Sequence, residues 1–286
     1  MYRLSNTSQI GLLSRNETAA GAVRYARERL ADAASGLEFE PLAHRYSFCG
    51  EDIPSVSSIV GHFDPFDVRA CAERCSRSSR HELFGRSVDD ILAIWEERGR
   101  TASETGTAVH EFCEACYLVK SGRCDAIEGP LRERLGKDGT LLAATPKEEA
   151  AARWWDSLDL ERFVLVAKET RIYNPELRYA GTFDLLLYDL KLGHYVQRDY
   201  KTNADLFRWY GDRLRAPLSH IKADDVGKYT VQQNLYSIQL NNIDIRVGDM
   251  SLVWFKDDAS FQEVPLPNLD RLISFAARQY QLSQAA

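Results

Sequence analysis

Tyr179-Ala-Gly-Thr-Phe-Asp-Leu-Leu-Leu-Tyr188 and His194-Tyr-Val-Gln-Arg-Asp-Tyr-Lys201 are two runs of strand length, separated by a short connection that ends in Gly193. Such a connection predicts that the two runs pair as antiparallel strands. Residues i and i+2 of a strand point to one face, so Asp199 and Lys201 share a face while Tyr200 turns inward. The pairing also brings Asp184 of the first run toward Asp199. Two carboxylates and an ammonium group are therefore expected to converge.

The sequence on either side extends this pair into an α/β fold. Residues 163–173 form a third predicted strand, set off by the turn residues Asn174-Pro175, so residues 163–201 predict an antiparallel meander. A further strand is expected at 249–255, with a partner at 262–265, which gives a mixed sheet. Helical spacing and capping signals predict flanking helices over 17–34, 55–62, 67–78, 88–97, 101–119, 224–240 and 269–282, and one that opens at Thr145-Pro-Lys-Glu148.

Length and composition are those of a globular protein. The chain has 286 residues, of which 44% are hydrophobic and 27% charged, so it can bury a full core. We expect residues 1–100 to form a mostly helical N-terminal region with a small hairpin at 45–53. Residues 101–286 are then the core domain. A single large domain is the alternative.

Composition also disfavours several classes of protein. No apolar stretch approaches the ~20 residues of a membrane helix, and the N-terminus lacks the apolar core of a secretory signal. We therefore expect an intracellular protein with no membrane partner, cytoplasmic if its source is a bacterium or a phage. The six cysteines are irregularly spaced and are expected to be free thiols. The net charge of -6 disfavours a protein that coats nucleic acid, although it allows a local basic groove.

Two stretches could supply such a groove. Residues 69–86 carry five arginines against two glutamates. Phe207-Arg-Trp-Tyr210, followed by Arg213 and Arg215, places aromatic rings among guanidinium groups, as surfaces that bind single strands do. Arg208 and Trp209 are therefore candidate substrate-binding residues. A solvated helix face is the alternative for both stretches.

Four short motifs stand in order along the chain: Gly106-Thr-Ala-Val-His110, Gly181-Thr-Phe-Asp184, Asp199-Tyr-Lys201 and Gln232-Gln-Asn-Leu-Tyr236. Hydrolysis of a phosphodiester needs an activated water and neutralised phosphate charge, which one hard divalent cation can provide. Asp184 and Asp199 suit Mg2+, and the backbone carbonyl of Tyr200 could add a third oxygen. Lys201 would orient or deprotonate the attacking water, because a partly desolvated lysine has a lowered pKa. Glycine at position 106 of a helix indicates that another backbone or a substrate comes close there.

On these motifs the chain resembles the PD-(D/E)XK nuclease superfamily, specifically its RecB-like branch. That branch is marked by a Gly-x-x-x-His helix, a Gly-x-x-Asp strand, an Asp-x-Lys strand and a Gln-x-x-x-Tyr helix, and the match spans residues 106–236. The stretch from His44-Arg-Tyr-Ser-Phe to Pro54-Ser-Val-Ser-Ser is also similar to the N-terminal segment of phage exonucleases and mitochondrial genome maintenance exonucleases of this branch. The resemblance implies a restriction-endonuclease-like core, with a mixed sheet that contains an antiparallel meander.

The resemblance also implies the residues of a metal centre. His110, Asp184 and Asp199 would ligate Mg2+ or Mn2+, and Lys201 would be catalytic. Relatives commonly carry glutamate at the position of Asp199, and the shorter side chain still ligates metal. Taken alone, a histidine such as His110 is more often a packing residue than a ligand. A buried acid such as Asp184 needs a partner or a metal.

Four further positions are implied around that centre. Gln232 and Tyr236, one helical turn apart, would contact DNA or brace the metal site. Taken alone, Tyr236 could be a core residue and Gln232 a surface residue. Glu169 falls where relatives carry an acid on the first core strand, and it is a candidate of second rank. Glu114, on the helix of His110, is another.

The cysteines allow a different kind of metal site. Two cysteine pairs have spacings that could hold zinc: Cys71 and Cys75 form Cys-x3-Cys, and Cys113 and Cys116 form Cys-x2-Cys. The second pair, however, lies within a predicted helix. Some RecB-like nucleases hold an iron-sulfur cluster with one cysteine before the nuclease core and three after it. Every cysteine of this chain precedes residue 125, so no such cluster is expected.

The expected activity is exonucleolytic cleavage of DNA that depends on Mg2+ or Mn2+ and favours single-stranded ends, in replication, recombination or repair. The chain ends soon after its last predicted helix, so we expect any helicase, polymerase or recombination partner to be a separate protein. One alternative is a structure-specific or nicking endonuclease with the same centre. Another is a non-catalytic DNA-binding accessory. Intact Asp184, Asp199 and Lys201 favour an enzyme, because a pure binder has no need for an uncompensated carboxylate pair.

Overall fold

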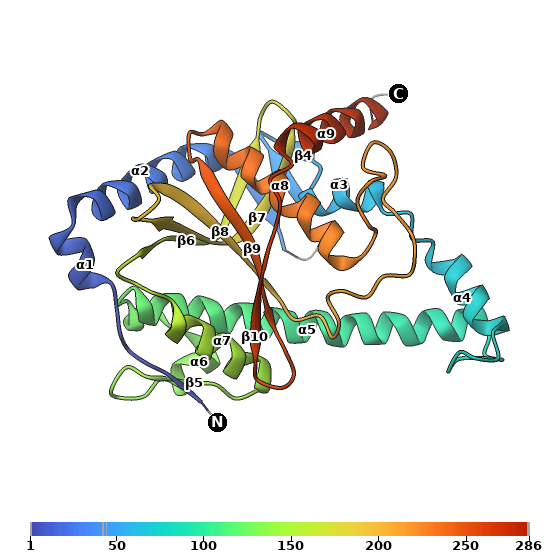
Figure 1. Cartoon of the computed structure of the whole chain (residues 1–286), viewed down its shortest axis with the longest axis horizontal. Helices are drawn as coiled ribbons and strands as arrows, with labels where there is room; N and C mark the ends of the chain where they lie inside the picture. The colour runs from blue at the N-terminus through green and yellow to red at the C-terminus, as the bar shows by residue number, and fades with distance from the viewer. Residues whose placement is uncertain (1, 42, 44, 285–286) are drawn as a thin grey trace.

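The centre of the structure is a five-stranded mixed sheet, seen in a computed structural model that describes residues 2–41, 43 and 45–284 (Figure 1). The strands lie in the order β10-β9-β8-β7-β6, and β6, β7 and β8 form the predicted antiparallel meander. β8 pairs in parallel with β9, which pairs antiparallel with β10. The strands are β6 (Phe163–Asn174), β7 (Tyr179–Asp189), β8 (His194–Lys201), β9 (Val247–Phe255) and β10 (Phe261–Pro265).

Helices cover both faces of this sheet, so the prediction of an α/β protein is confirmed. Buried residues of α2, α3, α8 and α9 form one hydrophobic core with the sheet, and those of α5 and α7 form the other. In α2, the buried residues Val23, Ala26 and Leu30 are three or four positions apart, which gives a single apolar stripe. The helices are α1 (Ile10–Arg15), α2 (Glu17–Ala34), α3 (Val56–Phe63), α5 (Val88–Lys120), α6 (Gly129–Glu133), α7 (Pro146–Ser157), α8 (Asp225–Asn242) and α9 (Asp270–Gln284), with a 3-10 turn, η1 (Cys124–Ala126).

Side chains cap two of the helices that pack on the sheet. Thr145 and Glu148 form the predicted capping box at the start of α7, each side chain accepting a hydrogen bond from the other's backbone N–H. Asp224 accepts a hydrogen bond from Gly227 N at 2.7 Å and so caps α8. Within the described residues, no helix has the length and apolar character needed to cross a membrane.

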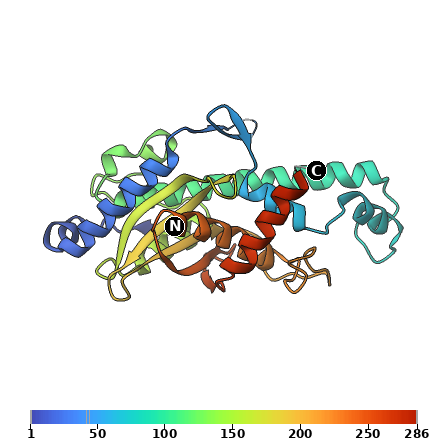
Figure 2. The ribbon, with the colours of Figure 1, turned by 90° about the horizontal axis from the view of Figure 1, so that it is seen from above.

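One long helix, α5, replaces the two helices expected at 88–97 and 101–119. The helix continues through Gly99 because Arg100 forms ion pairs with Glu97 at 2.6 Å and Glu104 at 2.5 Å on either side. Residues 96–105 are exposed, and α4 (Val68–Arg77) packs on the far end (Figure 2). The expected domain boundary at residue 100 therefore lies inside a continuous helix. We call residues 68–108 the α4–α5 arm.

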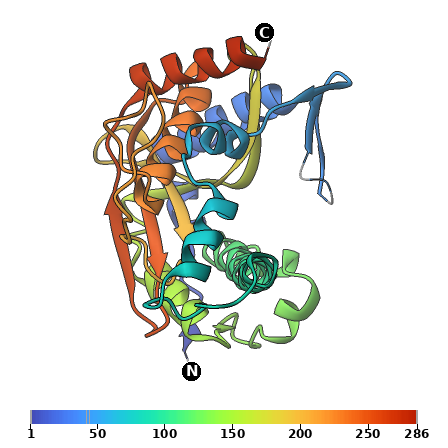
Figure 3. The same ribbon diagram turned by 90° about the vertical axis from the view of Figure 1, so that its right-hand side faces the viewer.

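Two small sheets contain strands that were not expected. The predicted hairpin forms as β3 (Arg45–Phe48) and β4 (Glu51–Ile53), but β2 (Leu37–Glu40) adds a third strand to it. Figure 3 shows these strands projecting away from the main sheet. β1 (Arg3–Leu4) pairs with β5 (Leu141–Leu142). Strands of two to four residues are too short for a period to be visible in the sequence. His44 lies outside the described residues.

Candidate metal centre

The candidate centre forms where β7 and β8 separate. Backbone pairing between these strands ends at Leu185 and Arg198. Just beyond this point, Asp184 Oδ2 accepts a hydrogen bond from Tyr200 N at 2.7 Å, so the carboxylate occupies the place of a backbone partner. Burial raises the pKa of Asp184, a rise that His110 opposes. The carboxylate is thus held between two strands, in an environment that favours a cation nearby.

Glu169 lies on the neighbouring strand at the level of Asp184, because the pairs on either side of it are Lys168 with Leu185 and Thr170 with Phe183. Its φ of 38° is in the left-handed region, which typically costs a non-glycine residue about 1–3 kcal/mol. The same strand shifts its register between Leu165 and Ala167. This irregular backbone brings Glu169 Oε1 to 3.2 Å from His110 Nδ1. Strain of this kind often marks functional sites.

His110 reaches the two carboxylates from α5. Its Nδ1 lies 3.2 Å from Glu169 Oε1 and 3.6 Å from Asp184 Oδ2, and its Nε2 lies 3.3 Å from Tyr200 O. In its neutral form, the imidazole that donates from Nε2 to this carbonyl presents the lone pair of Nδ1 toward the carboxylates, as a metal ligand does.

The charge of His110 is set by two opposing effects. Burial lowers the pKa of His110, but the charges of Asp184 and Glu169 outweigh burial and raise it to about 9.

These three side chains fit a divalent cation. One donor atom each from His110, Glu169 and Asp184 lies within 4.8 Å of the other two. Ligands on opposite sides of one Mg2+ or Ca2+ ion are roughly 4–5 Å apart, so a single ion can contact all three atoms. Carboxylate and imidazole donors suit Mg2+ and Mn2+ alike. Glu169, a residue of second rank in the sequence, is therefore a full member of the group.

Asp199 lies beside this group rather than within it. Its carboxylate forms an ion pair with Lys201 Nζ, as the shared strand face predicted. Burial raises the pKa of Asp199 to about 6, against the effect of Lys201. For Lys201, burial lowers the pKa, but Asp199 and Asp184 outweigh burial and raise it. The expected lowering of the lysine pKa is therefore wrong, because the acids around Lys201 stabilise its ammonium form.

The side chain of Tyr200 packs in the core, whereas its backbone faces the candidate centre. Its ring turns inward, as predicted, and packs against Trp154 at 5.8 Å and Phe255 at 5.7 Å between ring centroids. Its backbone carbonyl, the expected third oxygen ligand, faces His110 Nε2. In this arrangement the carbonyl orients the histidine.

One face of α8 closes the centre from the other side. Lys201 Nζ lies 4.3 Å from the ring centroid of Tyr229, a contact that was not expected from the sequence. Tyr229, Gln232 and Tyr236 are spaced three and four residues apart, so the helical period could have revealed this face. Tyr236 is buried, which favours a packing role over contact with DNA. Gln232 Oε1 is buried without a hydrogen-bond partner among the described residues.

Glycine 181 makes room for that face. A Cβ added at Gly181 would lie 2.6 Å from Tyr236 Cε1 and 2.9 Å from Val56 Cγ2, so no larger residue fits without movement. At Gly106 the nearest atom is Thr202 Oγ1, at an ordinary 3.5 Å from such a Cβ. Gly106 is therefore not explained by a close backbone in the described structure. Glu114 forms an ion pair with Lys168 and stands outside the metal-binding group.

The two basic stretches differ in structure. In residues 69–86, Arg69 and Arg77 pair with carboxylates, and Glu82 pairs with Arg98, which favours a solvated helix surface there. Arg208 and Trp209 lie in segment 202–223, between Lys201 and the cap of α8, where several aromatic side chains are exposed.

The zinc alternative is not supported by the fold. Cys71 and Cys75 belong to a small cluster between α4 and α5, whereas Cys113 and Cys116 are buried in the core between α5 and the sheet. All six cysteines are free, and no group that could hold a metal includes one within the described part of the chain.

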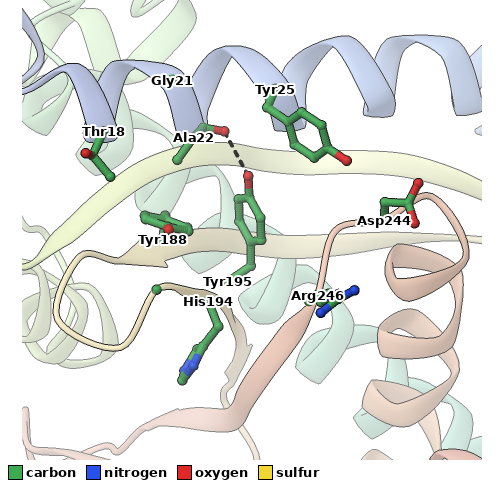
Figure 4. Close-up of a pocket in the computed structure, with 10 residues that line it drawn as sticks. Thr18, Gly21, Ala22, Tyr25, Tyr188, His194, Tyr195, Asp244 and Arg246 are labelled. Carbon is green, nitrogen blue, oxygen red and sulfur yellow. Dashed lines mark hydrogen bonds between the residues drawn. The ribbon is translucent and has the colours of Figure 1, made fainter.

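One pocket lies away from the candidate centre. It measures about 360 Å³ and lies between α2 and the β7–β8 hairpin, lined by Tyr25, Tyr188 and Tyr195 among others (Figure 4). The Tyr195 hydroxyl donates a hydrogen bond to Ala22 O at 2.9 Å across it. None of the candidate site residues lines this pocket.

Comparison with known proteins assigns no family. A scan against protein-family models finds none that matches, and a search of curated proteins finds no match.

Proposed function

We propose that this protein is a metal-dependent DNA exonuclease with a PD-(D/E)XK-type centre on a restriction-endonuclease-like core. The observation that supports this most is the convergence of His110, Glu169 and Asp184 beside the Asp199–Lys201 ion pair. The four motifs occupy a helix, two adjacent strands and a second helix, in the order expected of the RecB-like branch. Processing of DNA in replication, recombination or repair is the corresponding role.

Each residue of the centre has a task in phosphodiester hydrolysis. His110, Glu169 and Asp184 would hold Mg2+ or Mn2+, which when bound supplies positive charge and an activated water. Tyr200 O keeps the His110 ring oriented. Lys201, held as an ammonium by Asp199, stabilises negative charge on the phosphate and orients the water, rather than removing its proton.

An enzyme accounts for the structure better than a non-catalytic binder does. Buried acids at positions 184 and 199 and a left-handed residue at 169 each lower the stability of the fold. A surface that only binds DNA gains nothing from them.

The proposal is tested with end-labelled linear single-stranded DNA and protein stripped of metal by a chelator. We expect cleavage only after Mg2+ or Mn2+ is restored. Lys201→Met and Asp184→Asn should each lower the cleavage rate by at least about 100-fold, as loss of a charge-stabilising group does in other enzymes. Lys191→Met is the matched control, because Lys191 is an exposed lysine in the β7–β8 turn.

Circular dichroism would show whether each variant is folded. Cleavage by folded Lys201→Met at the rate of the wild-type protein would contradict the proposal. Full activity of the wild-type protein in excess chelator would contradict it as well.

A further inference from the structure

Segment 202–223 follows the candidate centre in the chain and forms a well-anchored loop. It begins at the residue after Lys201, and three buried leucines, Leu206, Leu214 and Leu218, anchor it in the core. Leu214 N donates to Ile221 O at 3.1 Å, and Ala223 N donates to Asp212 O at 3.0 Å. These bonds join the two halves of the loop, so its conformation is largely fixed before anything binds.

The start of the segment is tied to both sides of the centre. Trp254 Nε1 donates to Asn203 O at 2.7 Å, and Asn203 Nδ2 donates to Asp225 Oδ2 at 2.7 Å. Tyr229, which lies under the Lys201 ammonium, donates to Asn203 Oδ1 at 3.2 Å. A group on this loop is therefore held at a fixed position relative to the centre.

Large aromatic rings face outward from this firm base. Phe207 is 49% exposed, Trp209 42% and Tyr210 78%. Exposed rings of this size, grouped within four residues, are an unusual surface for a protein in water unless they bind something. Trp209 Nε1 donates to Asp212 O at 2.6 Å, which fixes the indole ring.

The same segment is positively charged. It contains four cations, Arg208, Arg213, Arg215 and Lys222, against two acids, Asp205 and Asp212. Lys222 Nζ lies 4.8 Å from the ring centroid of Trp209, and Arg208 lies 5.2 Å from that of Tyr210. Within the described residues, none of the four cations forms an ion pair with a carboxylate. The α4–α5 arm, by contrast, pairs several of its arginines with acids.

We propose that segment 202–223 is a platform for the single-stranded part of the DNA substrate, with bases stacking on Trp209 and Tyr210. Arg208 and Lys222 would contact the phosphates that link those bases. Trp209 follows Lys201 by eight residues, so the Cα atoms of the two residues lie at most roughly 29 Å apart. This inference rests on the proposed nuclease function. The platform would give a DNA strand that is bound at the centre a second point of attachment.

The test separates base stacking from charge. Binding of a fluorescein-labelled oligothymidylate 12-mer is measured by anisotropy in EDTA, where no metal-dependent cleavage occurs. An abasic 12-mer of the same charge is measured in parallel. We expect the wild-type protein to bind the oligothymidylate more tightly. Trp209→Ala and Tyr210→Ala should each weaken that binding at least about five-fold, the lower end for a base on an aromatic ring, and hardly change abasic binding.

Two controls guard the interpretation. Phe84→Ala removes a ring of the α4–α5 arm whose exposure, 55%, lies between those of Trp209 and Tyr210, and it should leave both affinities unchanged. Tyr210→Ala supplements Trp209→Ala, because Tyr210 is the most exposed of the rings and its loss disturbs the loop least. Equal affinity of the wild-type protein for the two oligonucleotides would overturn the platform. Unchanged binding in both variants would overturn it too.

Failure of the platform can be told apart from failure of the nuclease proposal. Bis(4-nitrophenyl) phosphate carries no nucleobase and only one phosphate, so its hydrolysis with Mn2+ reports on the centre without the strand contacts proposed for Trp209 and Tyr210. If the protein hydrolyses this ester but binds both oligonucleotides equally, the nuclease proposal stands and the platform is rejected. If the protein prefers the oligothymidylate but does not hydrolyse the ester, the platform stands and the nuclease proposal is rejected.

Discussion

At the residue scale, the chemistry of the centre follows from how charges are compensated. Two buried carboxylates, Asp184 and Asp199, lie near each other, and each has a cationic neighbour: His110 for the first and Lys201 for the second. Lys201 and His110 differ in how readily they lose a proton. Lys201 stays protonated because the acids raise its pKa. The His110 proton is the one that a metal must displace, because a ligating imidazole is neutral.

We therefore predict that metal binding releases a proton. The pKa of His110 is raised to about 9 in the absence of metal, so the ring is protonated at pH 7. Binding of Mn2+ at pH 7 should release close to one proton, and the apparent affinity should rise about ten-fold per pH unit between pH 6 and 8. Calorimetry in two buffers of different ionisation enthalpy measures the proton count.

His110→Gln should bind Mn2+ more weakly and release much less than one proton. His220→Gln, in segment 202–223, is the matched control and should behave like the wild-type protein. A proton count near zero for the wild-type protein at pH 7 would show that His110 is already neutral or does not bind the metal.

At the element scale, the packing of α8 on β7 depends on the absence of a side chain at position 181. The Tyr236 ring occupies the space where a Cβ would lie, at 2.6 Å. We predict that Gly181→Ala lowers the free energy of unfolding by about 1–3 kcal/mol, as overpacking does in other cores. Urea denaturation of the metal-free protein measures this change.

The same substitution in a Tyr236→Ala background should have a smaller effect, because the ring that it meets is gone. Gly21→Ala is the control. Nothing lies within 4 Å of a Cβ added at Gly21, so alanine should leave the stability unchanged or raise it slightly. A Gly181→Ala variant as stable as the wild-type protein would mean that Tyr236 moves aside freely.

The elements with a clear period could be predicted, and those fixed by longer-range contacts could not. The meander and α8 show their periods over eight or more residues, so their strands, pairing and shared faces were predicted correctly. Glu169 was placed only in the second rank, because its position beside His110 depends on a left-handed backbone that no local pattern encodes. The continuity of α5 was missed because its middle is exposed and lacks an apolar stripe, while its ion pairs stabilise the helix without one.

At the scale of the whole molecule, the candidate centre lies between two projections. His110 comes from α5, whose first half extends with α4 beyond the sheet, and segment 202–223 extends from the end of β8 on the same side of the molecule (Figures 1 and 2). The face of α8 with Tyr229 and Tyr236 closes the centre from within. If the proposed nuclease function holds, a DNA strand at Asp184 would lie between the arm and the segment, and a free end would enter there more readily than a closed loop.

This arrangement separates an exonuclease from the endonuclease alternative. We predict that linear single-stranded DNA is degraded from an end with Mn2+, while the same DNA as a closed circle survives. Gel electrophoresis of the circle before and after linearisation provides the comparison, with identical sequence and charge. Rapid cutting of the circle would favour the endonuclease, because a strand without an end could then reach the centre from the side. Such a result would leave the metal-binding residues in place and would show that the arm and segment 202–223 form an open groove.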